Sequence, residues 1–319
     1  MVGIHRILIL MTVPQPQSRK APHHVPTVPL ALADEIRPGQ SLELLKELHI
    51  LTQDGKLNQD SRRKLKQVNH LCQFIEKLLR ELAKQQPPQT ITLADHGAGK
   101  SYLGFILYDL FFRQHSESHI YGIETRAELV QKSCNLATRL NFDRMTFLNL
   151  TVAQAAQSTA CPERVDMVTA LHACDTATDD AIAFGLQKHA RFMVLVPCCQ
   201  AEVARLLNQN KALSLSGTPI SELWRHPLHT REMGSHLTNV LRCLYLQACG
   251  YHVCVTELVG WEHSLKNELI VARYTGQHHR SAADRLRVLL AEFGLMPLLH
   301  TRFTALIDNA AHVGVSTCE

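Results

Sequence analysis

Short apolar runs alternate with amphipathic segments between residues 91 and 196 of the chain. The runs have the length and aliphatic content of buried strands, and the segments between them repeat apolar residues at helical spacing. Such alternation is typical of parallel strands joined by right-handed helical crossovers, with helices on both faces of one sheet. We expect strands at residues 91–95, 120–124, 145–150, 165–171 and 191–196, and helices at residues 101–113, 126–140 and 178–190.

The alternation stops after Cys199, and the rest of the chain has a different order of elements. Residues 207–234 are polar and interrupted by Pro and Gly, which indicates an irregular insertion. Two later strand-like runs with no helix between them predict an antiparallel hairpin at the sheet edge. The fold class is therefore α/β, with a seven-stranded, mostly parallel sheet that ends in this hairpin. We expect a helix at 235–249, strands at 251–259 and 268–274, and a helix at 280–294 before a frayed tail.

The segment before the sheet is predicted to be helical, after a lead-in rich in Pro, Gln and His. Ser41 is a candidate N-cap of a first helix, and Asp60 with Ser61 of a longer one that runs to Leu82. Four cations within residues 62–66 open this longer helix; a solvated face is the favoured interpretation and a phosphate-contacting patch the alternative. The expected parts are a disordered lead-in at 1–29, a helical region at 30–88, the sheet domain at 89–276, and a C-terminal helix and tail at 277–319.

Composition is that of a globular protein: 319 residues, of which 45% are hydrophobic and 19% charged. A formal net charge of +4 and 19 histidines permit a nucleic-acid partner without requiring one. The ten cysteines form no Cys-x-x-Cys pair, and several lie in apolar runs, which fits reduced thiols in a cytoplasmic protein. The apolar run at residues 7–13 is too short to cross a membrane, so we expect no membrane span. Met11 is a candidate start of translation.

Residues 95–100 read Asp-His-Gly-Ala-Gly-Lys, directly after the first predicted strand. Glycines there let the backbone turn tightly and approach a ligand, and the helix that follows offers unpaired N–H groups. The spacing fails for a phosphate-binding P-loop, and Tyr102 stands where a dinucleotide fingerprint needs its third glycine. A carboxylate before two glycines suits S-adenosylmethionine (SAM), whose methionine ammonium favours a nearby carboxylate. An ordinary turn with two glycines is the alternative.

Ligands of open parallel sheets bind at the carboxyl ends of the strands, so the predicted strand ends are the candidate site. At the second strand, Glu124, followed by Thr125, can accept both ribose hydroxyls of an adenosine cofactor; a solvated acid is the alternative. At the third strand, Asn149 and Leu150 suit contacts with an adenine edge, and plain loop chemistry explains them equally well.

The fourth and fifth strands end in residues that would face a methyl acceptor. Leu171 precedes His172, whose imidazole can take a proton from an acceptor hydroxyl, whereas Asp175 is better explained as the N-cap of the next helix. Cys198 follows Pro197, an arrangement like the nucleophile of 5-methylpyrimidine methyltransferases. For these thiols a buried structural role ranks first, a nucleophile second and a metal ligand third, because the possible ligands His172, Cys174, Cys198 and Cys199 lack the usual spacing.

Three stretches together resemble one methyltransferase-domain family: residues 95–100, residues 170–175 (Ala-Leu-His-Ala-Cys-Asp) and residues 197–199 (Pro-Cys-Cys). Residues 64–69 and 262–268 are also similar to that family. It includes the tRNA acceptor-stem 2′-O-methyltransferases and the eukaryotic methyltransferase-like and "ribosomal RNA adenine dimethylase domain-containing" proteins. The resemblance implies a Rossmann-like class I methyltransferase fold with SAM as the cofactor. Family members usually have Gly where Asp175 stands, and the zinc-binding Cys/His segment of the tRNA enzymes is not visible here.

These observations predict a SAM-dependent methyltransferase that acts on structured RNA such as tRNA or rRNA. A protein or small-molecule acceptor and a non-catalytic SAM-binding scaffold are the alternatives; no membrane partner and no structural metal are expected, and the sequence does not indicate an oligomeric state. The candidate cofactor contacts are Asp95, His96, Gly97, Gly99, Lys100, Glu124, Thr125, Asn149, Leu150, Leu171 and His172. The catalytic candidates are His172 and Cys198, and the substrate-side candidates are Trp224 to stack a base, Arg231 to hold a phosphate, Lys266 and Asn267.

Overall fold

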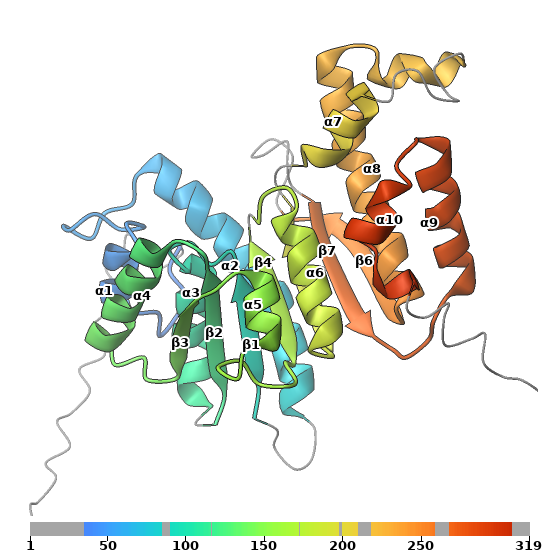
Figure 1. Cartoon of the computed structure of the whole chain (residues 1–319). Helices are drawn as coiled ribbons and strands as arrows, with labels where there is room; N and C mark the ends of the chain where they lie inside the picture. The colour runs from blue at the N-terminus through green and yellow to red at the C-terminus, as the bar shows by residue number, and fades with distance from the viewer. Residues whose placement is uncertain are drawn as a thin grey trace, which may run out of the picture.

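The computed structural model describes residues 35–84, 90–115, 117–171, 173–197, 200–209, 218–258 and 268–307, and in these ranges helices cover both faces of a central sheet (Figure 1). The strands are β1 (Thr92–His96), β2 (His119–Glu124), β3 (Met145–Asn149), β4 (Met167–Leu171), β5 (Phe192–Val196), β6 (Tyr251–Glu257) and β7 (Glu268–Tyr274). The helices are α1 (Leu42–Glu47), α2 (Gln59–Ala83), α3 (Tyr102–Leu110), α4 (Ala127–Arg139), α5 (Val152–Gln157), α6 (Ala177–Gln187), α7 (Glu202–Gln209), α8 (Pro227–Ala248), α9 (Arg280–Glu292) and α10 (Pro297–Thr301), with short 3₁₀ turns η2 (Phe112–Gln114) and η3 (Pro219–Trp224).

The seven strands lie in the order β3-β2-β1-β4-β5-β7-β6. The pairs among β1 to β5 are parallel, whereas β7 runs antiparallel to both β5 and β6. The chain leaves β1 towards β2 and β3 and returns to β4 on the other side of β1, so the topological switch point lies between β1 and β4. The predicted Rossmann-like class I methyltransferase fold, with its late antiparallel hairpin, is confirmed.

Alternate side chains of the strands face two separate apolar cores, as the two-residue period of a β-strand requires. One core joins Leu93 of β1 and Val194 of β5 with α1 to α4. The other joins Ala94 of β1 and Leu195 of β5 with α5 to α10. The central strands are buried on both faces, which is why their sequences read as continuous apolar runs.

The N-terminal helices pack into the first core and begin at polar caps. Ser41 caps α1 by accepting a hydrogen bond from the N–H of Leu44, as predicted. The prediction that Asp60 and Ser61 cap α2 is wrong, because the Asn58 side chain accepts the hydrogen bond from the Ser61 N–H. Asn and Asp are equally good N-caps, so residue type alone does not show whether α2 is capped at position 58 or at position 60.

Four helical segments differ from the sequence prediction. Helices α5 and α7 were not predicted, and α10 lies in residues that we expected to be frayed. Helix α8 begins at Pro227 instead of residue 235, inside the segment taken for an irregular insertion. Proline is favoured in the first turn of a helix, but the first residues of α8 are mostly exposed and therefore lack an apolar period.

The N-terminal half of α2, and η3 with the first turns of α8, extend beyond the carboxyl ends of the parallel strands (Figure 1). In this view they stand on opposite sides of this edge of the sheet. No helix within the described ranges combines the length and hydrophobicity that a membrane span needs. The expected lead-in at residues 1–29 lies outside the described residues.

Candidate active site

The turn after β1 uses glycine where the backbone requires it. Gly97 and Gly99 have φ angles of +61° and +57°, a left-handed conformation that L side chains rarely adopt. The N–H of Ala98 donates to the carbonyl of Ile123 in β2 at 3.2 Å, which fixes the turn against the neighbouring strand. Ser101 is also left-handed, at φ +50°, and α3 begins at the next residue.

Asp95, at the end of β1, is buried beneath this turn. One carboxylate oxygen accepts a hydrogen bond from the Thr169 hydroxyl at 2.8 Å, and the other lies 3.5 Å from the Ser101 hydroxyl. Burial raises the pKa of Asp95 to about 6, although both hydroxyl contacts act to lower it. A carboxylate can accept more than two hydrogen bonds, so Asp95 can accept another besides those from Thr169 and Ser101.

Gly104 in the first turns of α3 brings this helix close to the same carboxylate. A Cβ at Gly104 would lie 2.6 Å from the Ser101 Oγ and 3.6 Å from an oxygen of Asp95. A side chain at position 104 would therefore displace the Ser101 hydroxyl from its place beside Asp95.

Glu124, at the end of β2, reaches across to the glycine turn. Its carboxylate accepts hydrogen bonds from the N–H of Gly99 at 2.8 Å, from the N–H of Arg126 at 3.0 Å, and from the Arg126 guanidinium at 3.0 and 3.1 Å. Burial acts to raise the pKa of Glu124, but these hydrogen bonds together outweigh it and lower the pKa to about 2. The carboxylate is thus ionised at neutral pH, and the Arg126 side chain that covers it is 59% exposed.

The end of β3 braces the end of β2. The Asn149 amide donates to the carbonyls of Glu124 at 3.1 Å and Thr125 at 2.8 Å, so its NH₂ group holds the turn and its oxygen faces no partner among these contacts. Thr151 begins α5 through a reciprocal capping box with Gln154. The Thr-x-x-Gln pattern at residues 151–154 is the sequence signature of a capping box, but α5 was not predicted from it.

Lys100 faces a groove of about 550 Å³ between α1 and α4. Its neighbours along the groove include His49, Lys132 and Arg139, and the last of these pairs with Glu47 at 2.7 Å. The glycine turn therefore has a cationic groove directly beside it.

His96 points to the opposite face of the sheet from Asp95. Its ring lies against Phe184 of α6, with ring centroids 4.3 Å apart. Both ring nitrogens are buried and have no hydrogen-bond partner among the described residues. Burial lowers the pKa of His96 to about 3, so the imidazole is neutral.

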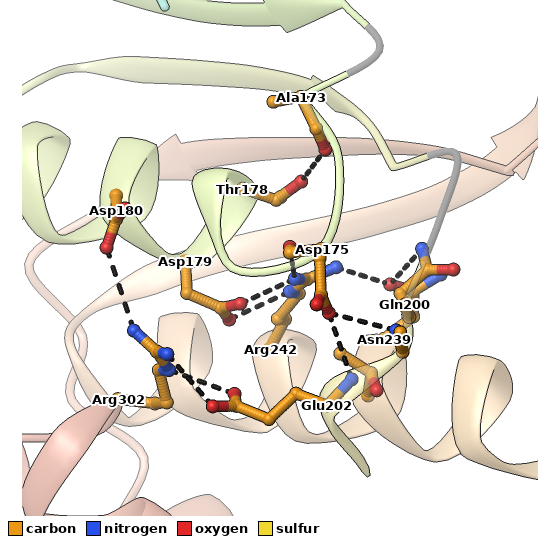
Figure 2. A network of polar contacts seen from close by, with 12 residues as sticks. Ala173, Asp175, Thr178, Asp179, Asp180, Gln200, Glu202, Asn239, Arg242 and Arg302 are labelled. Atoms are coloured by element: carbon orange, nitrogen blue, oxygen red, sulfur yellow. Dashed lines mark hydrogen bonds and ion pairs between the residues drawn. The ribbon is translucent and has the colours of Figure 1, made fainter. Parts of the chain in front are cut away.

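The segments after β4 and β5 are joined by a buried polar network (Figure 2). Asp175 has a φ of +51°, and its carboxylate accepts hydrogen bonds from the N–H groups of Ala201 and Glu202 at 2.9 and 3.0 Å. Asp175 therefore caps the start of α7. The prediction that it caps the next helix, α6, is wrong: Thr176 is at that N-cap position and makes no side-chain cap bond.

Arg242 of α8 is the centre of this network and is fully buried (Figure 2). Its guanidinium donates to both carboxylate oxygens of Asp179, at 2.9 and 2.5 Å. It also donates to the carbonyl of Asp175 at 2.8 Å and to the Asn239 side chain at 3.1 Å. The role of Arg242 was not predicted, because nothing in the local sequence indicates that this arginine is buried.

The remaining predicted site residues are not gathered at the glycine turn by any contact within the described residues. His172, Cys198, Lys266 and Asn267 lie outside the described residues. Trp224 ends η3, and Arg231 is an exposed residue of α8 that pairs with Glu232 at 2.9 Å. Leu150 and Leu171 are partly buried against opposite cores. Within the described ranges, no group of three or more His, Cys, Asp or Glu side chains is arranged to hold a metal ion.

Strand order, the left-handed glycine turn and the carboxylates at the ends of β1 and β2 define the class I methyltransferase fold. A family model described as a methyltransferase domain matches residues 63–206. This domain implies SAM-dependent methyltransferase activity and supports SAM as the cofactor. The residues present fit this cofactor, since Gly97 and Gly99 place no Cβ between the backbone and a ligand and the Asp95 carboxylate can accept a further hydrogen bond.

No curated protein matches the chain. Similar solved structures include an rRNA methylase from Streptococcus thermophilus, with 9% identity over 64% of this chain and 95% of that chain, at a TM-score of 0.39. Magnesium protoporphyrin IX methyltransferase from Synechocystis PCC 6803 with bound SAM has 11% identity over 75% of this chain and 100% of that chain, at a TM-score of 0.39. Fibrillarin from Methanococcus jannaschii has 10% identity over 59% and 68% of the two chains, also at 0.39. Similarity at this level does not indicate the acceptor.

Proposed function

We propose that the protein transfers the methyl group of SAM to RNA, with the cofactor bound over the glycine turn between β1 and β2. The observation that carries the proposal is the contact between Glu124 and the Gly99 N–H, which joins the two strand ends into one edge. A buried carboxylate, Asp95, lies below the same turn.

In this proposal Asp95 receives the methionine ammonium of SAM, and Gly97 and Gly99 let the ligand approach the backbone. Glu124 accepts the ribose hydroxyls once the exposed Arg126 side chain moves aside. Only the Arg126 half of this ion pair is exposed, so the guanidinium can turn into solvent while the Gly99 and Arg126 N–H groups keep their hydrogen bonds to the buried carboxylate. The free oxygen of Asn149 is available to the adenine.

Bound SAM supplies an electrophilic methyl group, and the protein's part is to align the acceptor and accept its proton. We assign the proton to His172, which comes directly after β4, and a structural role to Cys198 ahead of a nucleophilic one. Because β4 is next to β1, its carboxyl end belongs to the same edge as the glycine turn.

RNA is supported as the acceptor by charge. Lys100 belongs to the glycine turn, and with Lys132 it lines a groove of about 550 Å³, in a chain of net charge +4. Phosphates are bound by such cations. Within the resembling family, the tRNA acceptor-stem 2′-O-methyltransferases offer the acceptor class to try first. The proposed substrate contacts are Trp224, Arg231, Lys266 and Asn267.

The proposal is tested by incubating the full chain with methyl-labelled SAM and total RNA. The expected result is label that ribonuclease releases and protease does not. The test variant is Glu124→Gln, and Glu128→Gln on α4 is its control, because Glu128 is exposed. Label that only protease releases would favour a protein acceptor. Cofactor binding without any transfer would favour a scaffold, and absence of cofactor binding would overturn the proposal.

A further inference from the structure

A second groove, of about 620 Å³, runs along the N-terminal half of α2. The helix contributes Arg63, Lys66, Asn69, His70 and Gln73 to its lining, and Glu35 lies across from them. The volume is within the range of ligand pockets. Every lining residue except Leu65 has a polar or charged side chain, although carbon atoms supply most of the lining surface.

The charge of this groove is positive. Glu35 is paired with the neighbouring Arg62, at 2.8 Å, and the groove is lined by three cationic side chains, Arg62, Arg63 and Lys66, against this one carboxylate. Within the part of the chain that the structure describes, the ion pair of Arg63 is a long contact of 3.9 Å with Asp60, in which both side chains are exposed. The helix dipole is positive at the N-terminus and favours an anion there, and cationic side chains at the same end add to this positive potential. The first turns of α2 therefore favour a bound anion twice over, through the dipole and through the side chains.

The groove also contains groups that can pair with base edges. The Asn69 amide donates to the carbonyl of Glu35 at 3.4 Å, while its buried oxygen has no hydrogen-bond partner among the described residues. Gln67 and Gln73 add two more amides to the lining. Amide side chains can donate to and accept from the edge of an unpaired base.

The position of the groove suits a substrate of the proposed reaction. The N-terminal half of α2 stands beyond the carboxyl ends of the strands (Figure 1). The Ser61 hydroxyl of α2 lies 3.4 Å from the carbonyl of His49, and His49 lines the groove that contains Lys100. Helix α2 is thus in contact with the segment that lines the Lys100 groove.

We propose that the α2 groove binds a single-stranded segment of the RNA substrate. Arg63 and Lys66 hold its phosphates, and Asn69 pairs with a base edge. This inference rests on the proposed function, because it supplies the substrate for the same site. The strand continues from the α2 groove towards Lys100 at the glycine turn.

The test measures binding of a fluorescein-labelled single-stranded RNA of about 12 nucleotides to the full chain by anisotropy over a range of salt concentrations. Arg63→Glu is expected to weaken binding about tenfold and to reduce the salt slope by about 0.7, the value for one phosphate on a single strand. Lys64→Glu is the control, because Lys64 is the exposed cation next to Arg63 and does not line the groove. It should change the affinity less than threefold.

A second variant, Asn69→Ala, should weaken binding while leaving the salt slope unchanged. Equal losses in Arg63→Glu and Lys64→Glu would overturn the groove, since binding would then follow overall charge. So would binding that Arg63→Glu leaves unchanged. Calorimetry with S-adenosylhomocysteine separates this inference from the proposed function: Arg63→Glu should bind the cofactor product like the unmodified chain, even if the groove assignment fails.

Discussion

Arg242 and Asp179 form a two-pronged ion pair in the interior of the protein, with N–O distances of 2.9 and 2.5 Å. The Arg242 side chain is 1% exposed and the Asp179 side chain 9%. The same guanidinium bonds the carbonyl of Asp175, so the pair ties α6 and α8 to the segment that follows β4 (Figure 2).

Replacing Arg242 with Met should lower the free energy of unfolding by about 3–5 kcal/mol, because Asp179 would remain buried without its partner. Urea unfolding followed by circular dichroism measures the change. Arg231→Met on the same helix is the control; Arg231 is exposed, so its loss should change stability by about 0.5 kcal/mol or less. A loss below about 1 kcal/mol in Arg242→Met would show that the network contributes little.

The proposed contact between Asp95 and the methionine ammonium predicts that cofactor affinity depends on pH. Its folded pKa of about 6 lies above the ordinary value, so below pH 6 the carboxyl is protonated and must lose a proton to pair with an ammonium. Affinity for SAM should therefore be constant above about pH 6 and fall roughly tenfold per pH unit below it. Calorimetry between about pH 5 and about pH 7.5, which covers both sides of this pKa, measures this dependence.

The Asp95→Asn variant is the control for this dependence, because an amide does not titrate. Its affinity should be lower than that of the unmodified chain at pH 7 and flat across the range. Folding stability changes with pH in the opposite direction, because the buried carboxyl is more stable when it is protonated. The stability that Asp95 contributes is present below its unfolded pKa, falls as the pH rises between the unfolded and folded pKa values, and is lost above about pH 6. An unchanged pH profile in Asp95→Asn would remove Asp95 from the cofactor site.

Glu124 and Arg126 should respond differently to mutation, although they bond each other. Glu124→Gln removes a charged acceptor for the ribose and should weaken S-adenosylhomocysteine binding at least tenfold. Arg126→Ala should keep affinity within about fivefold, because the guanidinium is exposed and only covers the carboxylate. It should also raise the pKa of Glu124 from about 2 towards its ordinary value, which a nuclear magnetic resonance titration can follow. Equal losses in both variants would mean that Arg126 itself binds the cofactor.

The strands could be predicted because their burial on both faces leaves a continuous apolar run, and the long helices because one face of each is apolar. The position of Asp95 and Glu124 at the carboxyl ends of β1 and β2 could be predicted, because it depends only on where the strands end, whereas their part in cofactor binding stays a prediction. The contacts of these residues depend on tertiary structure. Asp175 caps a helix that begins at Glu202, and Arg242 bonds Asp179, so neither role shows in local sequence.

Asp175 offers a last test, because two effects oppose each other there. Its φ of +51° is a glycine conformation, so Asp175→Gly should relieve strain worth about 1 kcal/mol. The same change removes the cap on α7, which costs about 0.5–2 kcal/mol. The two nearly cancel, and the expected net change in unfolding free energy is below about 1 kcal/mol. Asp175→Ala loses the cap and keeps the strain, so it should cost about 1–2 kcal/mol in urea unfolding. If Ala and Gly were equally destabilising, backbone strain at this position would be negligible, and the carboxylate cap alone would explain why aspartate is accepted where the resembling family has glycine.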